Sequence, residues 1–182
     1  GAASAADEAF AQAEASFDKV SAAVGEALDA LEKTPAAAQG VLAAASGDVQ
    51  GVIDAYRALR ESVAQADPSS PLLPRIDQAI LGLANLQGSI DDASEALGQG
   101  AARAEEARVA VTARIDEARA AIQGLRSSYD AKLRDEAAQL GATLALVRDA
   151  SEKLAGQVDA TAKGLAGASS SLGDDLDGVR AS

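Results

Sequence analysis

The sequence contains no Cys, His, Met or Trp, and only four of its 182 residues are aromatic. Without Cys and His, the chain cannot form a disulfide, a Ser–His or Cys–His nucleophile pair, or a thiolate or imidazole metal site. The net charge of −12 disfavours nucleic acid and anionic membrane surfaces as partners, because both attract clustered Lys and Arg. These absences exclude several classes of enzyme and binding protein.

Long hydrophobic runs are also missing. The longest stretch without a charged residue is 34–47, which covers 14 residues. A membrane-spanning helix needs about 18 or more apolar residues, so we expect no span in this sequence and membrane contact only through segments outside it. The chain begins at Gly1 and has no Met, which favours its interpretation as an excised or processed part of a longer protein.

Alanine is the most frequent residue and occupies 47 of the 182 positions. It is the strongest helix former but buries little area, so an alanine-rich core depends on close approach between helices. Apolar residues recur at alternating steps of three and four, beginning with a run from Phe10 to Leu31, and this spacing is typical of coiled-coil seams. The sequence therefore predicts an all-α fold, an elongated antiparallel helical bundle or coiled coil of four to six helices.

Prolines divide the predicted bundle. A Thr-Pro pair at 34–35 is typical of a helix start, so residues 1–66 are predicted to form a helical hairpin. Three prolines within residues 67–74 predict a Pro-rich turn, because proline interrupts the hydrogen bonds of a helix interior. Residues 75–172 are predicted to add further helices to the same domain, and residues 173–182 are expected to form a frayed tail.

Two glycine-containing segments leave the number of helices open. Gly98-Gln99-Gly100 (98–100) predicts a second break, although the seam can be continued through it as a kinked helix. At 124–127, Gly124 followed by Ser127 is compatible with a helix end and a new start, or with one continuous helix.

The longest seam lies in the last third of the chain and keeps its spacing without a slip. Ser151 and Thr161 place small polar side chains on it, and their hydroxyls can bond to the preceding helical turn, so they weaken the stripe without interrupting it. Its twelve positions are Leu133, Ala137, Leu140, Leu144, Val147, Ser151, Leu154, Val158, Thr161, Leu165, Ala168 and Leu172.

Motifs that carry chemistry are weak. Ser16 and Lys19 have the Ser-x-x-Lys spacing of serine acylases, but the other elements of that site are missing. The acidic run 174–178 lacks the glycine spacing and distal Glu of a calcium loop, and no phosphate loop or dinucleotide fingerprint is present. The sequence predicts no catalytic, cofactor-binding or metal-binding residues, and a protein that is not an enzyme.

The sustained seams favour a non-enzymatic interaction, spacer or sensor module that binds a protein partner or associates with itself. Tyr56 and Tyr129 are the candidate partner surface if they are exposed, since aromatic side chains often anchor interfaces; the alternative places them in the core. An acidic first third, 1–56, is a further place to look for a partner. An excess of Arg over Lys and the alanine content suggest a bacterial protein. We expect an extracytoplasmic, periplasmic or cell-envelope location, with the cytoplasm as the alternative.

One segment carries a resemblance to a known family. Asp67-Pro68-Ser69-Ser70-Pro71-Leu72, followed by the seam from Ile76 to Leu97, resembles the helical tail of mammalian-cell-entry (MCE) lipid-transport proteins. The resemblance covers residues 67–97 and implies a lipid-associated or lipid-transport accessory role in the cell envelope. The basic closing stretch and the β-rich domain of that family are not present in the sequence.

Overall fold

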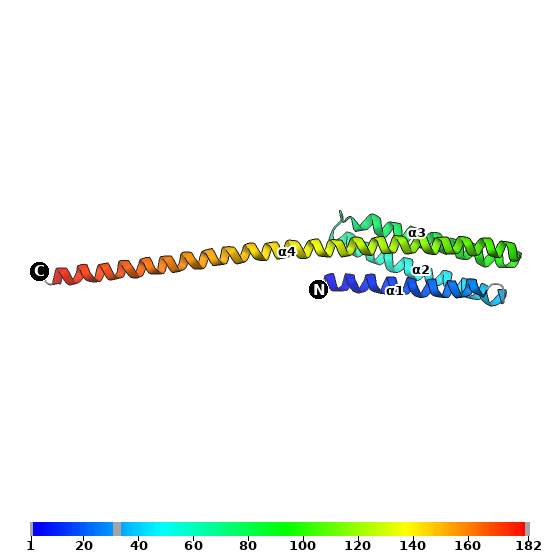
Figure 1. The fold of residues 1–182 in the computed structure, drawn as a ribbon, viewed down its shortest axis with the longest axis horizontal. Helices are drawn as coiled ribbons and strands as arrows, with labels where there is room; N and C mark the ends of the chain where they lie inside the picture. The colour runs from blue at the N-terminus through cyan, green and yellow to red at the C-terminus, as the bar shows by residue number, and fades with distance from the viewer. Residues whose placement is uncertain (1, 31–33, 181–182) are drawn as a thin grey trace. The chain divides into compact units, whose positions relative to one another are not determined.

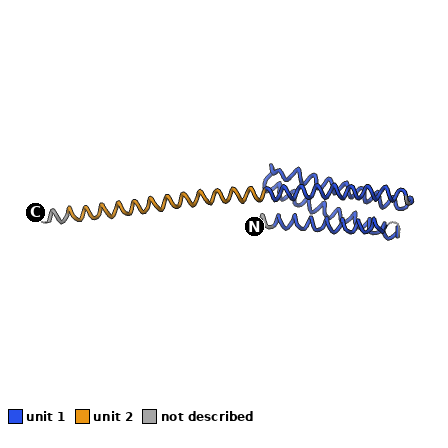
Figure 2. Tube along the Cα trace, in the orientation of Figure 1, with its two compact units in different colours: residues 1–131 blue, residues 132–182 orange. Residues whose placement is uncertain are grey.

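The computed structural model describes residues 2–30 and 34–180, and within these ranges the chain is helical without any strand. This confirms the predicted all-α class. The chain divides into two compact units, residues 1–131 and 132–182, which we describe separately (Figure 2). The elements in chain order are α1 (Ala2–Asp29), α2 (Pro35–Ala66), α3 (Leu72–Ala96), a 3-10 turn η1 (Leu97–Gln99) and α4 (Ala101–Arg180) (Figure 1).

Helix starts follow the prolines. Thr34 is the N-cap of α2 and Pro35 is its first residue, where the missing backbone N–H costs nothing. The predicted turn at 67–74 is shorter in the structure, because α3 already begins at Leu72 and its first turn accommodates Pro74. Leu31 of the first seam and the last two residues of the predicted tail lie outside the described residues.

The two glycine segments behave differently. At 98–100 the chain forms η1 and then turns at Gly100, whose φ of 112° is a conformation that favours glycine. At 124–127 the chain is one continuous helix, and the Ser128 hydroxyl donates to the Gly124 carbonyl within it at 3.0 Å. The predicted break at 98–100 is therefore confirmed, and of the two alternatives at 124–127 the continuous helix is present.

In the first unit, four helices pack in antiparallel order, each against the next along the chain, and α4 also packs against α1. Phe10 of α1 stacks on Tyr129 of α4 with 4.3 Å between the ring centroids. The Arg119 guanidinium of α4 lies 6.0 Å from the ring of Phe17 in α1, so residue numbers decrease along α4 as they increase along α1. Small and branched seam residues fill the interior, among them Val24, Leu42, Val49, Ile76, Leu83, Leu86, Ile90 and Val111.

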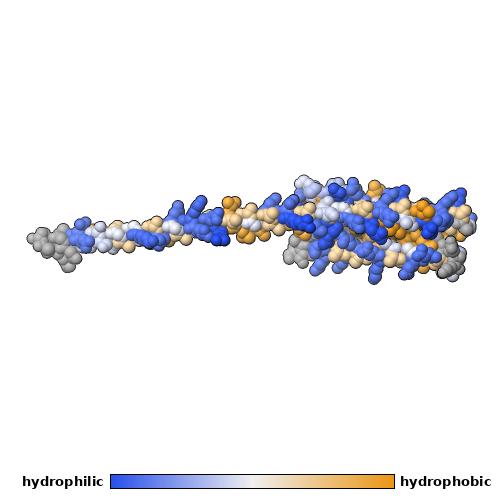
Figure 3. Space-filling model, in the orientation of Figure 1, coloured by the Kyte–Doolittle hydropathy of each residue, from blue (hydrophilic) through white to orange (hydrophobic). Residues whose placement is uncertain are grey.

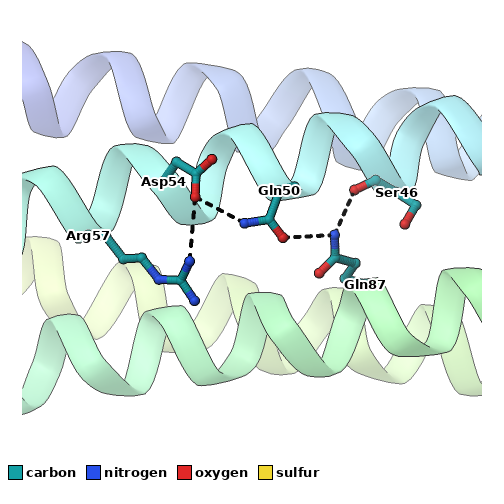
Figure 4. Close-up of polar contacts among 5 residues, drawn as sticks. All are labelled: Ser46, Gln50, Asp54, Arg57 and Gln87. Atoms are coloured by element: carbon teal, nitrogen blue, oxygen red, sulfur yellow. Dashed lines mark hydrogen bonds and ion pairs between the residues drawn. The ribbon is translucent and has the colours of Figure 1, made fainter.

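Polar contacts at the edge of this core set the register between α2 and α3. The Gln87 amide of α3 donates to the Ser46 carbonyl at 3.1 Å and to the Gln50 side-chain oxygen at 3.2 Å (Figure 4). Gln50 in turn donates to Asp54 at 3.0 Å, and Arg57 lies 3.5 Å from the same carboxylate oxygen. Hydrogen bonds of this kind depend on alignment, so a shift of one helical turn would break them.

An ion pair also joins α2 to α3, nearer the Pro-rich turn. Arg60 donates to both carboxylate oxygens of Asp77, at 2.5 and 3.2 Å. This bidentate pair adds geometric specificity even at a half-exposed position. With the Gln cluster it holds α2 and α3 at two places along their length.

Glycine permits the closest approach between α3 and α4. A Cβ added at Gly82 would lie 3.2 Å from the backbone Cα of Ala118, whereas one added at Gly88 on the same helix would meet nothing within 4 Å. Ala118 itself is fully buried. A methyl group at position 82 would therefore fit only if the Ala118 backbone moved away by a few tenths of an ångström.

We expect Gly88→Ala to raise the free energy of unfolding by about 1 kcal/mol, because alanine favours the helix over glycine. Gly82→Ala should lack this gain and fall at least about 1 kcal/mol below Gly88→Ala, because its methyl group presses on the Ala118 backbone. Urea unfolding followed by circular dichroism measures both variants. Equal stabilisation by the two substitutions would contradict the close approach.

The second unit contains the remainder of α4. Every described side chain from Arg134 to Asp175 is exposed, and α4 continues to Arg180. The sequence predicts that residues 75–172 join the bundle of residues 1–66, but the seam from Ala137 to Leu172 is exposed. Residues 173–180 belong to the predicted frayed tail and instead continue the helix. The reason is that α4 is much longer than the helices that could cover it. It has 80 residues, whereas α1, α2 and α3 have 28, 32 and 25.

Candidate functional site

Both tyrosines singled out by the sequence lie inside the bundle. Tyr56 is 0% exposed and Tyr129 is 5% exposed, so the structure places them in the core and neither presents an anchor to a partner. Tyr129 is held against Phe10, and the Arg126 guanidinium lies 5.8 Å from its ring. A tyrosine on or beside a seam favours the core over the surface in the sequence, and the burial of both side chains agrees with that alternative rather than with the candidate partner surface.

A cleft of about 480 Å³ opens between α1 and α4 of the first unit. Its polar side chains carry both signs of charge. Arg126 lies 3.4 Å from Asp7 of α1 and 3.2 Å from Asp130 of its own helix. The lining residues are Glu14, Phe17, Asp18, Arg119, Ile122, Gln123, Arg126 and Ser127.

Two buried polar atoms have no hydrogen-bond partner among the described residues: Oε1 of Glu14, which lines this cleft, and the hydroxyl of Tyr56. Burial raises the pKa of Glu14; Arg126 opposes this rise, and the neighbouring Asp130, Asp18 and Asp7 add to it. Burial also raises the pKa of Tyr56, with further contributions from Glu14 and Asp18.

Glu14 is not among the residues that the sequence motifs single out. Glu14 and Arg126 each directly follow a buried seam residue, Ala13 and Leu125 respectively, in helices that pair. That flanking position is a signal available in the sequence, but it becomes specific only when the pairing of α1 with α4 is known.

We expect Glu14→Gln to raise the melting temperature of the protein at pH 7. Because the pKa of Glu14 is raised above its ordinary value of 4.5, the folded state loses stability as pH rises through the folded pKa, whereas below pH 4.5 the carboxyl is protonated in both states. A neutral Gln removes this loss, so the gain should disappear below pH 4.5. Differential scanning calorimetry from pH 4 to 8 measures it.

Glu8→Gln on the exposed face of the same helix is the matched control and should not show this pH-dependent gain. A Glu14→Gln variant that is less stable than the wild type at pH 7 would show that the carboxylate is stabilising, contrary to the argument from burial.

The weak motifs of the sequence do not assemble into a site. Ser16 and Lys19 are both exposed on α1. In the part of the chain that the structure describes, no three Asp or Glu side chains gather where they could hold a metal ion. Within the same residues, none of the helices is long and apolar enough to cross a membrane.

The most extensive unpartnered feature is the seam of the second unit. We call the eleven positions from 137 to 172 the exposed seam; it consists of Ala137, Leu140, Leu144, Val147, Ser151, Leu154, Val158, Thr161, Leu165, Ala168 and Leu172. Its seven Leu and Val side chains are 57–68% exposed. Apolar and hydrophilic side chains are interspersed on the visible face of this unit (Figure 3).

Most charged side chains of this unit lie away from the exposed seam. In heptad notation (abcdefg) the seam occupies positions a and d, and Asp149, Glu152, Lys153, Asp159 and Lys163 occupy b, c and f. Lys163 pairs with Asp159 at 2.8 Å along this outer surface. The helix is therefore amphipathic, with one face suited to burial and one suited to water.

No family model matches this chain, and no curated protein or solved structure shows significant similarity to it. The resemblance of residues 67–97 to MCE tails stays a prediction. In the structure the corresponding apolar face of α3 is buried in the bundle, at Leu72, Ile76, Ala79, Leu83, Leu86, Ile90 and Ala93.

Proposed function

We propose that this protein is a non-enzymatic interaction module. The bundle of residues 1–131 is its folded scaffold, and the exposed seam binds a partner helix. The observation that supports this proposal most directly is an uninterrupted a/d pattern from Ala137 to Leu172 that the chain leaves uncovered. An exposed apolar stripe on an otherwise polar helix is typical of an interaction site.

The energy available to such an interaction is large. Burying a Leu or Val side chain contributes about 1.5–3 kcal/mol, and the exposed seam offers seven of them. Part of this gain is offset by the loss of translational and side-chain freedom on association. The gain comes from many similar residues distributed over several heptads.

The cleft of the first unit supports a ligand function less well. Arg126 is engaged by Asp7 and Asp130, and Arg119 lies 3.7 Å from Asp116 and beside the Phe17 ring. These arginines would have to give up their ion pairs with the carboxylates in order to bind a ligand, and the loss of those contacts would reduce the affinity. The uncovered seam has no such competing contact, and this favours an interaction module over a small-molecule sensor.

We include in this proposal a bacterial, extracytoplasmic setting within a larger envelope protein. Its support is compositional: eleven Arg against five Lys, a high alanine content, and no Cys. The full-length gene is expected to encode a secretion signal or a membrane segment beyond these residues. A full-length gene without either would overturn the setting but not the interaction.

The interaction is tested by site-specific photo-crosslinking in the cells that produce the protein. A photoreactive residue at Leu154, on the exposed seam, should yield covalent protein adducts. The same residue at Leu146, which is 70% exposed but lies at position c, should yield few. Both sites are apolar leucines of one helix, so they differ mainly in the face that they occupy. Equal labelling at the two sites, or none at Leu154, would overturn the proposed function.

A further inference from the structure

We infer that the partner of the exposed seam is a second copy of this chain, paired antiparallel to the first over residues 140–172. This inference rests on the proposed function and names its partner. In an antiparallel coiled coil, an a residue of one helix lies against a d residue of the other. A register can therefore be sought in which the large, small and polar residues of one exposed seam fit those of the same seam running in the opposite direction.

One antiparallel register matches the seam to itself. When Ser151 faces Thr161 of the second copy, the two polar positions meet each other instead of facing leucines. Ser151 already donates to the Val147 carbonyl at 2.8 Å, so its hydroxyl is satisfied when the seam is covered. The other layers then pair Leu140 with Leu172, Leu144 with Ala168, Val147 with Leu165, and Leu154 with Val158.

A parallel in-register pair is a poorer match. It places Ala168 against Ala168 and Leu144 against Leu144, so thin and thick layers alternate, whereas the antiparallel register pairs these large and small residues together. A parallel pair also brings two copies of Asp174 and Asp175 side by side. The antiparallel arrangement instead separates the two copies of this acidic pair and places each near Arg134, Asp135 and Glu136 of the second copy, so that each pair has at least one cation nearby.

The positions that flank the seam permit close helix approach. Apart from Arg148, the e and g positions between 141 and 171 are small or uncharged: Gly141, Thr143, Ala150, Ala155, Gln157, Ala162, Gly164, Ser169 and Ser171. Arg148 is directed along its own helix by a hydrogen bond to Glu152 at 3.0 Å. A shallow hollow lined by Ser151, Leu154, Ala155 and Val158 lies near the centre of the register, where a side chain of the second copy can insert.

The area is adequate for a stable pair. Fourteen Leu and Val side chains from two copies, each 57–68% exposed in one chain, would bury on the order of 1,000 Å² in total, which is about the minimum area of a biological interface before the flanking residues are added. Each copy contributes the same surface to the pair, as expected for an interface with two-fold symmetry.

Engineered cysteines test the register, because the 182 residues contain no cysteine of their own. The full-length S151C/T161C variant should form a disulfide-linked dimer under mild oxidation. Neither S151C nor T161C alone should do so, because identical residues lie about 15 Å apart along the axis in this register and a disulfide requires Cα atoms within about 7 Å. A cross-linked dimer from S151C alone would indicate a parallel pair and overturn the antiparallel arrangement.

Analytical ultracentrifugation tests the association itself. The wild type should sediment as a dimer, and L154E should raise the Kd at least about 100-fold, because it buries a charge on the seam. L146E, which places the same charge on the opposite face, should remain dimeric, and circular dichroism should show both variants fully helical.

The two proposals fail separately. A wild type that is monomeric at high micromolar concentration overturns the second copy as partner. If Leu154 still yields adducts with another protein in cells, the interaction module stands with a different partner. If the wild type is monomeric and Leu154 yields no adducts, both proposals are wrong.

Discussion

Alanine-rich seams stabilise a helical bundle only where backbones approach closely, and the rest of the first unit follows from this requirement. Small side chains gain little from burial at ordinary helix separations, so the contacts must be short. Gly82 against Ala118 is the clearest instance, with the α3 and α4 backbones so near that a methyl group would crowd them. The polar clusters at Gln87 and at Asp77 then select one alignment among the many that uniform small residues would otherwise permit.

The all-α class, the start of α2 and the break at 98–100 could be predicted because each depends on local chemistry. A proline at 35 and a positive φ at Gly100 act within a few residues, and so sequence reasoning reaches them. The heptad spacing was equally visible on both sides of Ala131. The heptad spacing predicts an apolar face but not whether another helix of the chain covers it. Whether it is covered depends on the lengths of the four helices, which are unequal.

The candidate sites show the same division between local and distant causes. Tyr56 and Tyr129 could have lain on the surface or in the core, and the helices packed around them determine that they are buried. The raised pKa of Glu14 depends on the burial that α1 undergoes and on charges from α4. Within the second unit the amphipathic pattern is local, so the sequence identifies the positions of the exposed seam, but it places them in the bundle rather than in contact with solvent.

The stacking of Phe10 on Tyr129 has a consequence for the order in which the protein is made. During synthesis, α1 emerges from the ribosome first and α4 much later. Phe10 is therefore exposed without its aromatic partner until nearly the whole bundle sequence has been translated. The α2–α3 hairpin, whose helices are joined by a few residues, closes its loop at low entropic cost before that point. The contact between Phe10 and Tyr129 therefore cannot form until α4 has been translated through residue 129. A chain that stalls before residue 129 would leave the aromatic face of α1 uncovered and open to capture by chaperones.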